Sequence, residues 1–396
     1  MIYSDFKGMK LSRLGFGAMR LPLAPGEDGR VDEALVEKMT RYAIEHGVNY
    51  FDTAYPYHGG QSERVMGRVL GKYPRDSYYL ATKYPGHQIS ETYNPAEIFE
   101  EQLKKCGVEY FDFYLLHNVY ENSIETYRDP RWGIMEYFLE QKKQGRIRHL
   151  GFSTHGSPEL MKEFLDQYGD EMEFCQIQLN YLDWTLQNGR EKYELLTERG
   201  IPVWVMEPVR GGRLANPGET AAAELKELRP EESTASWCFR WLQELPNVKM
   251  ILSGMSDMAQ MEDNVKTFSG GRALDEKETE KLYAIADVLK SSVPCTGCRY
   301  CCDGCPKGLD IPMLITTYND VCVSASMNTR MRVESMPEDK WPSACVACGK
   351  CAKVCPQKID VPGVMKKLTE ALEKIPSWAE LCRQRDEEAR RDRERG

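Results

Sequence analysis

Eight short apolar stretches recur before residue 255, and most are rich in β-branched and aromatic residues. Between them lie segments with apolar residues at helical spacing, such as 32–47, 95–107 and 157–169, and each of these three ends in a glycine that suits a helix C-terminus. Strands alternating with helices predict a parallel sheet, and eight such units close a (β/α)8 TIM barrel. An open doubly wound sheet is the alternative, but no G-x-G-x-x-G motif follows the first stretch. The stretches are 14–19, 48–54, 78–84, 110–117, 147–154, 174–181, 201–207 and 249–254.

Polar residues stand at the C-terminal ends of these stretches, where a barrel of this kind carries its active site. Asp52, Lys83 and His117 end three consecutive stretches, and Tyr57 follows Asp52 by five residues. In carbonyl reduction by hydride transfer, the reaction that the family resemblance described in the next paragraph implies, the alkoxide that forms needs a proton and nearby positive potential. A phenol with a pKa of about 10 is a weak acid alone, and we expect the ammonium of Lys83 to lower that pKa. Asp52 would orient Lys83, and His117 would donate to the substrate oxygen. The competing interpretation is that Asp52 and Lys83 form a structural ion pair and that His117 is a buried core residue.

Several motifs resemble those of the aldo-keto reductases, in the same order along residues 8–285. They read GVNYFDTAYPYHGGQSE, TKYPG, DFYLLHN, HLGFSTH, MEPVRGGRL and ILSGMS. The resemblance implies a (β/α)8 barrel that reduces carbonyls with NAD(P)H through a tetrad formed by the four residues above. Tyr55 and His58 are the alternatives beside Tyr57 for the acid.

The same resemblance implies a nicotinamide nucleotide site. Ser153 and Gln176 match positions that hold the nicotinamide amide, and Met206 stands where many members place a stacking aromatic residue. The pyrophosphate of the nucleotide would lie along a turn whose backbone amides can donate to the phosphate oxygens. The remaining implied contacts are Glu207, Pro208, Gly211 and Gly212 for the pyrophosphate, and Ser253, Gly254, Gln260, Asp263 and Asn264 for the adenosine.

The preference between NADH and NADPH depends on a clamp for the 2′-phosphate. Members that require NADPH carry Lys or Arg where this chain has Gly254 and Gln260, so we favour NADH. Arg210 and Arg213 are alternative partners for that phosphate. Five aromatic residues either shape a substrate pocket or anchor loops: Tyr120, Tyr127, Trp132, Trp184 and Trp204.

Nine of the 14 cysteines stand in two runs with one spacing, C-x-x-C-x-x-C-x-x-x-C-P, five of them in 295–305 and four in 345–355. Disulfides belong to oxidising compartments and zinc sites favour C-x-x-C pairs, so neither explains these runs. The spacing resembles that of bacterial ferredoxins, in which the fourth cysteine ligates the other cluster. Cys302 is left over, because Cys301 repeats the register of Cys351. The resemblance implies two [4Fe-4S] clusters, one on Cys295, Cys298, Cys301 and Cys355 and one on Cys305, Cys345, Cys348 and Cys351.

The segment between the two runs predicts helix, with apolar residues at Ile311, Leu314 and Ile315. It resembles the mainly α-helical ferredoxin-like domains of larger oxidoreductases. CPQKIDVPGVMKKL repeats the pattern of CPKGLDIPMLITTY, which indicates an internal duplication. The expected parts are a barrel over 1–288, a two-cluster domain over 289–378 and a charged tail over 379–396.

Composition limits the partners. A net charge of -9 without a basic stripe outside the tail argues against nucleic acid. No apolar run approaches the roughly 20 residues of a membrane span, and the N-terminal residues lack a signal-peptide core. We therefore expect a cytoplasmic protein with a small-molecule substrate and no membrane partner. Its oligomeric state is left open, and oxygen-sensitive clusters would suit an anaerobic host.

The clusters raise a question of electron number. NAD(P)H passes two electrons together as a hydride, whereas each cluster passes one, and a flavin normally mediates between them. The sequence shows no flavin motif and leaves a flavin open. We expect a reductase whose clusters relay electrons, with ferredoxin or another carrier as a partner. The alternative is an electron-transfer or docking protein whose clusters are structural or serve an external donor and whose barrel does not reduce carbonyls.

Overall fold

The computed structural model describes residues 1–26, 29–88, 90, 93–121, 123–289, 293–323, 327–377 and 380. The chain divides into two compact units, Met1–Ala286 and Asp287–Gly396. Apart from Glu380, the expected charged tail over 379–396 lies outside the described residues. Among the helices of the described ranges, none is long and apolar enough to cross a membrane.

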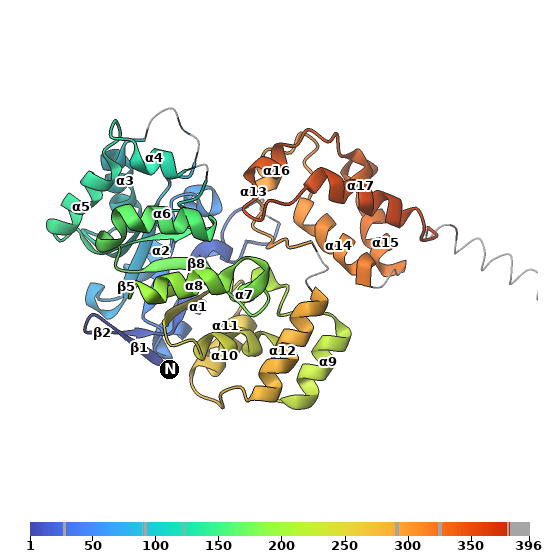
Figure 1. Cartoon of the computed structure of the whole chain (residues 1–396), viewed down its shortest axis with the longest axis horizontal. Coiled ribbons are helices and arrows are strands. Elements are labelled where there is room, and N and C mark those ends of the chain that lie inside the picture. The colour runs from blue at the N-terminus through green and yellow to red at the C-terminus, as the bar shows by residue number, and fades with distance from the viewer. Residues whose placement is uncertain are drawn as a thin grey trace, which may run out of the picture. The chain divides into compact units, whose positions relative to one another are not determined.

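The first unit is a closed barrel of eight parallel strands in the order β10-β3-β4-β5-β6-β7-β8-β9. Figure 1 labels the strands β5 and β8 among the helices of this unit. Each of the eight predicted apolar stretches forms one strand, because strands buried on both faces are apolar along their whole length. The (β/α)8 barrel is therefore confirmed. The strands are β3 Leu14–Gly17, β4 Tyr50–Asp52, β5 Tyr79–Tyr84, β6 Phe111–Leu116, β7 Ile147–Thr154, β8 Cys175–Gln178, β9 Val203–Met206 and β10 Val248–Ser253.

Helices of the first unit begin at local caps that the sequence supplies. The side chains of Asp32, Asn94 and Ser157 each accept a hydrogen bond from a backbone N–H in the first turn of the following helix. Gly107 ends its helix in the left-handed conformation as expected, but Gly169 has φ -60°, so the chain continues there into a 3-10 turn. The helices are α1 Glu33–Glu45, α2 Gln61–Leu70, α3 Pro95–Cys106, α4 Ile124–Arg128, α5 Ile134–Lys143, α6 Pro158–Tyr168, α7 Asp183–Leu186, α8 Gly189–Glu198, α9 Glu219–Leu228, α10 Thr234–Gln243, α11 Met258–Phe268 and α12 Glu276–Leu289.

An N-terminal hairpin, which the sequence reading did not predict, packs against the barrel interior. It consists of β1 Tyr3–Phe6 and β2 Met9–Ser12. The buried side chains of Phe6 and Leu11 belong to one apolar cluster with residues of the barrel strands. The ring of Phe6 lies 5.1 Å from that of Trp204, which is fully buried. Trp204 is therefore part of the barrel core and does not shape a substrate pocket.

The second unit is helical, as predicted, and its two halves repeat each other. Its helices are α13 Tyr300–Asp303, α14 Ile311–Val323, α15 Met327–Glu334, α16 Lys350–Val354 and α17 Val361–Leu372. Positive φ angles recur fifty residues apart, at Gly297 and Ala347 (67° and 52°) and at Gly308 and Lys358 (57° and 52°). Matching backbone turns at matching places support the internal duplication. A shared apolar core from α14 and α17 lies between the two cysteine runs.

Candidate active site and cysteine hollows

The four tetrad residues lie together at the C-terminal ends of neighbouring strands. Asp52 ends β4, Lys83 lies in β5, and His117 follows β6. Lys83 Nζ donates to Asp52 Oδ1 at 2.5 Å and to the carbonyl oxygen of Thr53 at 2.8 Å. The same Nζ lies 4.9 Å from the ring centroid of Tyr57, and the Tyr57 and His117 rings are 5.8 Å apart in an edge-to-face arrangement. Parallel strands bring residues that are far apart in the sequence into one site.

The structure distinguishes Tyr57 from its two neighbours. The hydroxyl of Tyr55 donates to Glu101 Oε2 on α3 at 3.0 Å. The ring of His58 accepts from the backbone N–H of Leu21 at 3.1 Å. Both alternatives are thus held by other elements, whereas the Tyr57 ring lies against Lys83 and His117.

The Asp52–Lys83 pair is fully enclosed, with side-chain exposures of 4% and 0%. Burial raises the pKa of Asp52 and lowers the pKa of Lys83, and the attraction between the two groups opposes both shifts. Asp52 Oδ2 is buried and has no hydrogen-bond partner among the described residues. Such a polar atom is costly to bury, which marks this pair as more than packing.

The pKa of Tyr57 differs from our expectation. It is raised well above its usual value, chiefly because the ring is buried and also because the carboxylates of Asp52 and Glu207 disfavour phenolate. Arg20 opposes this rise. The prediction that Lys83 would lower the pKa of Tyr57 is therefore wrong for the net direction, since desolvation and two carboxylates dominate and the cation that opposes them is Arg20.

His117 lies in an enclosed environment that keeps it neutral. Burial, assisted by the positive potential of His87 and Lys83, lowers its pKa well below the usual value. The His87 ring is 4.3 Å from the His117 ring, and burial lowers the pKa of His87 to about 4. Tyr127 donates its hydroxyl to the carbonyl oxygen of His117 at 2.7 Å. Tyr127 therefore anchors the loop beside the site.

Two of the other aromatic candidates have ring partners in the barrel unit. The ring of Trp132 lies 5.6 Å from that of Tyr93. The Trp184 ring lies 5.7 Å from Tyr193 and 5.3 Å from Trp241. These contacts are consistent with anchoring.

The expected nicotinamide residues are neighbours in the barrel. Ser153 on β7 pairs in register with Gln176 on β8. Ser153 Oγ accepts from the backbone N–H of Asn118 at 2.8 Å. Gln176 Oε1 is buried and lacks a hydrogen-bond partner among the described residues. An oxygen in that condition fits the N–H groups of a carboxamide, so these residues are compatible with a nicotinamide.

The turn after β9 is occupied by ion pairs. Glu207 has φ 56°, and its Oε1 lies 3.3 Å from an Nη of Arg20. The backbone of Gly211 also donates to Glu207. Arg210 is buried, and its Nε donates to Asp183 at 3.0 Å. The guanidinium that was an alternative clamp for a 2′-phosphate thus already has a buried carboxylate partner.

Of the expected adenosine residues, Ser253 and Asn264 contact each other, and the other three contact different parts of the barrel unit. Asn264 Nδ2 donates to Ser253 Oγ at 2.9 Å, which joins α11 to the end of β10. Asp263 instead accepts from Ser233 Oγ, at the start of α10, at 2.5 Å. The side chain of Gln260 accepts from the backbone N–H of Ser256 at 2.9 Å. A Cβ at Gly254 would lie 3.1 Å from the Arg20 side chain.

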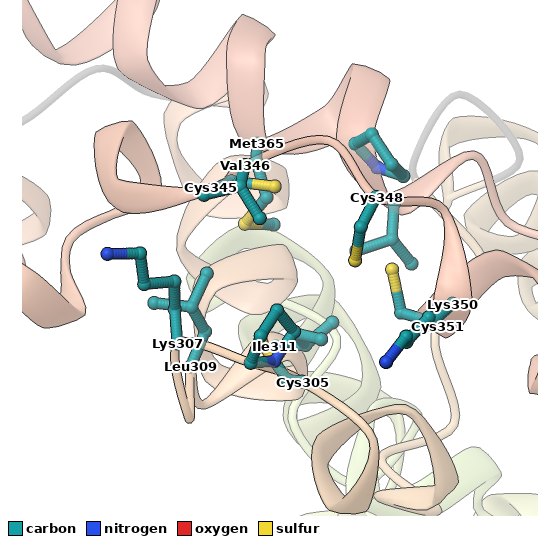
Figure 2. A pocket seen from close by; sticks show the side chains of 13 residues that line it. Cys305, Lys307, Leu309, Ile311, Cys345, Val346, Cys348, Lys350, Cys351 and Met365 are labelled. Carbon is teal, nitrogen blue, oxygen red and sulfur yellow. The ribbon is translucent and has the colours of Figure 1, made fainter.

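The eight predicted cluster cysteines surround two hollows. The first hollow is lined by Cys295, Cys298, Cys301 and Cys355. The second hollow is lined by Cys305, Cys345, Cys348 and Cys351. In Figure 2 the sulfur atoms of Cys348 and Cys351 turn toward the same space. Each hollow therefore combines three cysteines of one run with the fourth cysteine of the other, as the ferredoxin spacing implies.

These hollows fit a cluster better than a single ion. In the described part of the chain, no three His, Cys, Asp or Glu side chains lie close enough to hold one metal ion. A cubic cluster places each thiolate on a different iron, so its ligands surround a volume. Cys302 lines neither hollow, and its side chain contacts Cys301.

Comparison with known proteins agrees with this geometry. Residues 13–287 match the aldo/keto reductase family. The chain belongs to the aldo/keto reductase family. Residues 294–359 match a 4Fe-4S dicluster domain. This aldo/keto reductase thus carries an iron–sulfur domain after its barrel.

Curated aldo/keto reductases and related oxidoreductases are similar over the barrel. The NADH-specific methylglyoxal reductase of Escherichia coli (strain K12) is 26% identical over 323 residues, which cover 71% of this chain and 96% of that protein. The L-galactose dehydrogenase of Arabidopsis thaliana is 24% identical over 313 residues, which cover 72% and 93%. A solved aldo-keto reductase from Bacillus halodurans in its holo form has a TM-score of 0.58 and 24% identity, covering 72% of this chain and 96% of that one. The structural likeness supports the fold.

Two residues of this aldo/keto reductase site, His87 and Arg20, were not predicted from the sequence. His87 lies in the turn after β5 and Arg20 ends the 3-10 turn Ala18–Arg20, and the tetrad motif includes neither. Glu207 was assigned to the pyrophosphate path, whereas its carboxylate also raises the pKa of Tyr57. A signal for His87 was its place directly after TKYPG, at the end of the strand that carries Lys83.

Proposed function

We propose that this protein is an NAD(P)H-dependent reductase of a carbonyl or conjugated small molecule, with Tyr57 as the proton donor. The observation that carries the proposal is the enclosed Asp52–Lys83 pair, with the rings of Tyr57 and His117 beside it. An ammonium near a protonated phenol supplies both requirements of alkoxide formation, a proton and positive potential.

The pKa shifts support these roles. The raised pKa keeps the Tyr57 hydroxyl protonated at neutral pH, so the proton is present when an alkoxide forms. An alkoxide is a stronger base than phenolate, so it can take that proton even at a raised phenol pKa. Lys83 Nζ, 4.9 Å from the ring, favours the phenolate that remains. The lowered pKa of His117 leaves a neutral imidazole, which can donate one N–H to the substrate oxygen.

A nicotinamide cofactor would supply the hydride, and Ser153 and Gln176 would hold its carboxamide. We favour NADH, because Arg210 is paired with Asp183 and the Gln260 side chain caps Ser256. The NADH-specific E. coli relative supports the same choice. Dissociation constants from quenching of protein fluorescence test it, and tighter binding of NADPH would contradict it.

The second unit would hold two [4Fe-4S] clusters on the eight cysteines of the two hollows, as one-electron centres. Ferredoxin or another small carrier would be their partner. The second candidate is a scaffold role. It is favoured by the cysteines' place in the apolar core of the small unit, where Cys301 and Cys351 are buried.

An EPR experiment separates the relay role of the clusters from the scaffold role. The full chain would be purified without oxygen, its iron, sulfide and flavin counted, and its EPR spectrum recorded after NADH, NADPH or dithionite. A reduced-cluster signal after NADH supports the relay, whereas a signal with dithionite alone supports an external donor or a scaffold.

Tyr57→Phe removes the proposed acid and keeps the ring. We expect carbonyl turnover to fall at least about a hundredfold, while iron content and the dithionite-reduced EPR signal stay unchanged. Tyr55→Phe is the matched control, because its hydroxyl is held by Glu101. Ketone reduction that survives Tyr57→Phe would refute the assignment.

A further inference from the structure

The two cysteine hollows are related by the internal repeat, but they differ in exposure. Thr296 follows the first cysteine of one run, lines the first hollow and is 4% exposed. Val346 follows the first cysteine of the other run, lines the second hollow and is 55% exposed. The repeat therefore places an apolar side chain in solvent where its counterpart is polar and buried.

A second pair of repeat positions also differs in solvent exposure, and again the residue at the second hollow is the exposed one. Gln357 stands two residues after the last cysteine of its run, lines the first hollow and is buried. Lys307 occupies the equivalent position at the second hollow and is exposed. Among the ligands, Cys348 is exposed, whereas its counterpart Cys298 is half-buried. A centre in the second hollow would therefore lie nearer to solvent than one in the first.

The rim of the second hollow is positively charged. Lys307 and Lys350 both line it and are exposed. Within the described residues, neither ammonium forms an ion pair. Lys340 lies beside them, because its Nζ donates to the carbonyl oxygen of Lys307 at 2.7 Å, but this ammonium is 3.8 Å from the carboxylate of Asp339 and adds little net charge. At the first hollow, by contrast, the guanidinium of Arg299 is paired with Asp310 at 3.1 Å.

We propose that the rim of the second hollow, formed by Lys307, Val346, Cys348 and Lys350, is the docking surface for a small acidic protein that carries one electron. This rests on the proposed presence of clusters. One electron would leave the reduced carrier, which becomes oxidised, and enter the centre of the second hollow, which becomes reduced, and no bond is made or broken. Complementary charge steers such encounters, and the contact area they need is small.

The experiment measures binding directly, on the full-length protein purified without oxygen. The probe is a dye-labelled acidic [2Fe-2S] ferredoxin, and the readout is its fluorescence anisotropy at low and at moderate salt. We expect a complex that weakens as salt rises, and a loss of affinity of roughly tenfold or more with Lys307→Glu/Lys350→Glu at low salt. Val346→Thr, which installs the residue of the sister position, should also weaken binding without a change of charge.

A matched variant tests whether the position of the charge matters. Lys367→Glu/Lys374→Glu makes the same change of charge at two exposed lysines that do not line the hollow. We expect it to change the affinity by less than about threefold. Equal losses in the two double variants, or equal binding of the basic carrier cytochrome c, would overturn the proposal. Gel filtration gives a further outcome that would overturn the proposal. If the protein self-associates and Lys307→Glu/Lys350→Glu abolishes this association, the surface binds a second copy of the chain instead of a carrier.

Iron and sulfide counts keep this test separate from the proposed function. A protein without clusters would refute the cluster assignment itself. If the clusters are intact and ferredoxin binds the parent protein and Lys307→Glu/Lys350→Glu with equal affinity, only the docking surface is refuted. The binding readout does not depend on carbonyl turnover.

Discussion

Replacing Asp52 by asparagine would show how strongly the buried pair holds the reactive centre. The side chain of Lys83 has no exposed surface, and its Nζ donates to Asp52 at 2.5 Å. Asp52→Asn would leave the ammonium with the carbonyl oxygen of Thr53 as a hydrogen-bond acceptor and the carboxylate of Glu63 as the remaining anion. Breaking a buried ion pair from one side costs about 3–5 kcal/mol. With a urea dependence of about 3 kcal/mol per M, the unfolding midpoint should fall by roughly 1 M or more at pH 7.

The pH dependence of that loss has a defined sign. Burial already lowers the pKa of Lys83, and Asp52 opposes this shift, so Asp52→Asn lowers the folded-state pKa further below the unfolded value of about 10.4. Between those two pKa values the unfolded chain binds more protons than the folded chain. The unfolding free energy of the variant therefore rises with pH in this window, and its deficit should shrink between pH 7 and about pH 9.5.

Urea unfolding followed by tryptophan fluorescence, without oxygen, measures both effects, since Trp204 and Trp237 are buried in the barrel unit. The double variant Asp52→Asn/Lys83→Met removes the isolated charge. It should regain most of the lost stability while carbonyl reduction stays absent. If Asp52→Asn unfolds at the same urea concentration as the parent protein at pH 7, the buried pair does not contribute the expected stability. If the loss of unfolding free energy does not change with pH, the expected shift in the pKa of Lys83 is refuted.

Three further outcomes are expected. Because the pKa of His117 is lowered, the rate of carbonyl reduction should show no break near pH 6.5, and such a break would contradict the neutral imidazole. Because the pKa of Tyr57 is raised and that of Lys83 is lowered, the loss of rate at alkaline pH should follow deprotonation of the Lys83 ammonium. Cys355→Ala should lower iron from about eight to about four atoms per chain, whereas Cys302→Ala should leave it unchanged; the reverse result would contradict the crossed ligand sets. Trp204→Ala should lower the unfolding free energy by about 3–5 kcal/mol with an unchanged KM, and a raised KM would place this ring near the substrate.

Most of the barrel could be predicted, because its strands are buried on both faces and so appear as apolar stretches between helices. The N-terminal hairpin was missed, although Gly8 with φ 84° marks its turn. Its strands have four residues each, and burial is concentrated at Phe6 and Leu11. A pattern that short does not distinguish a strand from a loop.

The site was predictable where its chemistry is local in sequence. The cysteine spacing predicted which four cysteines would lie together, and the two hollows are lined by those residues. The pKa of Tyr57 was not predictable, because it depends on complete burial and on Glu207, which is 150 residues further along the chain. The same holds for Arg210, whose partner Asp183 is brought to it by the fold.

The seam of the barrel has a consequence for how the protein is made. The first strand, β3, pairs with β4 on one side and with the last strand, β10, on the other, where Ile251 lies beside Leu14. Arg13 spans the same seam, donating to the carbonyl oxygens of Gln243 and Val248. A nascent chain that stops short of β10 therefore leaves the edges of β3 and β9 unpaired. Such edges attract other chains, so the growing protein is most open to aggregation just before its eighth strand leaves the ribosome.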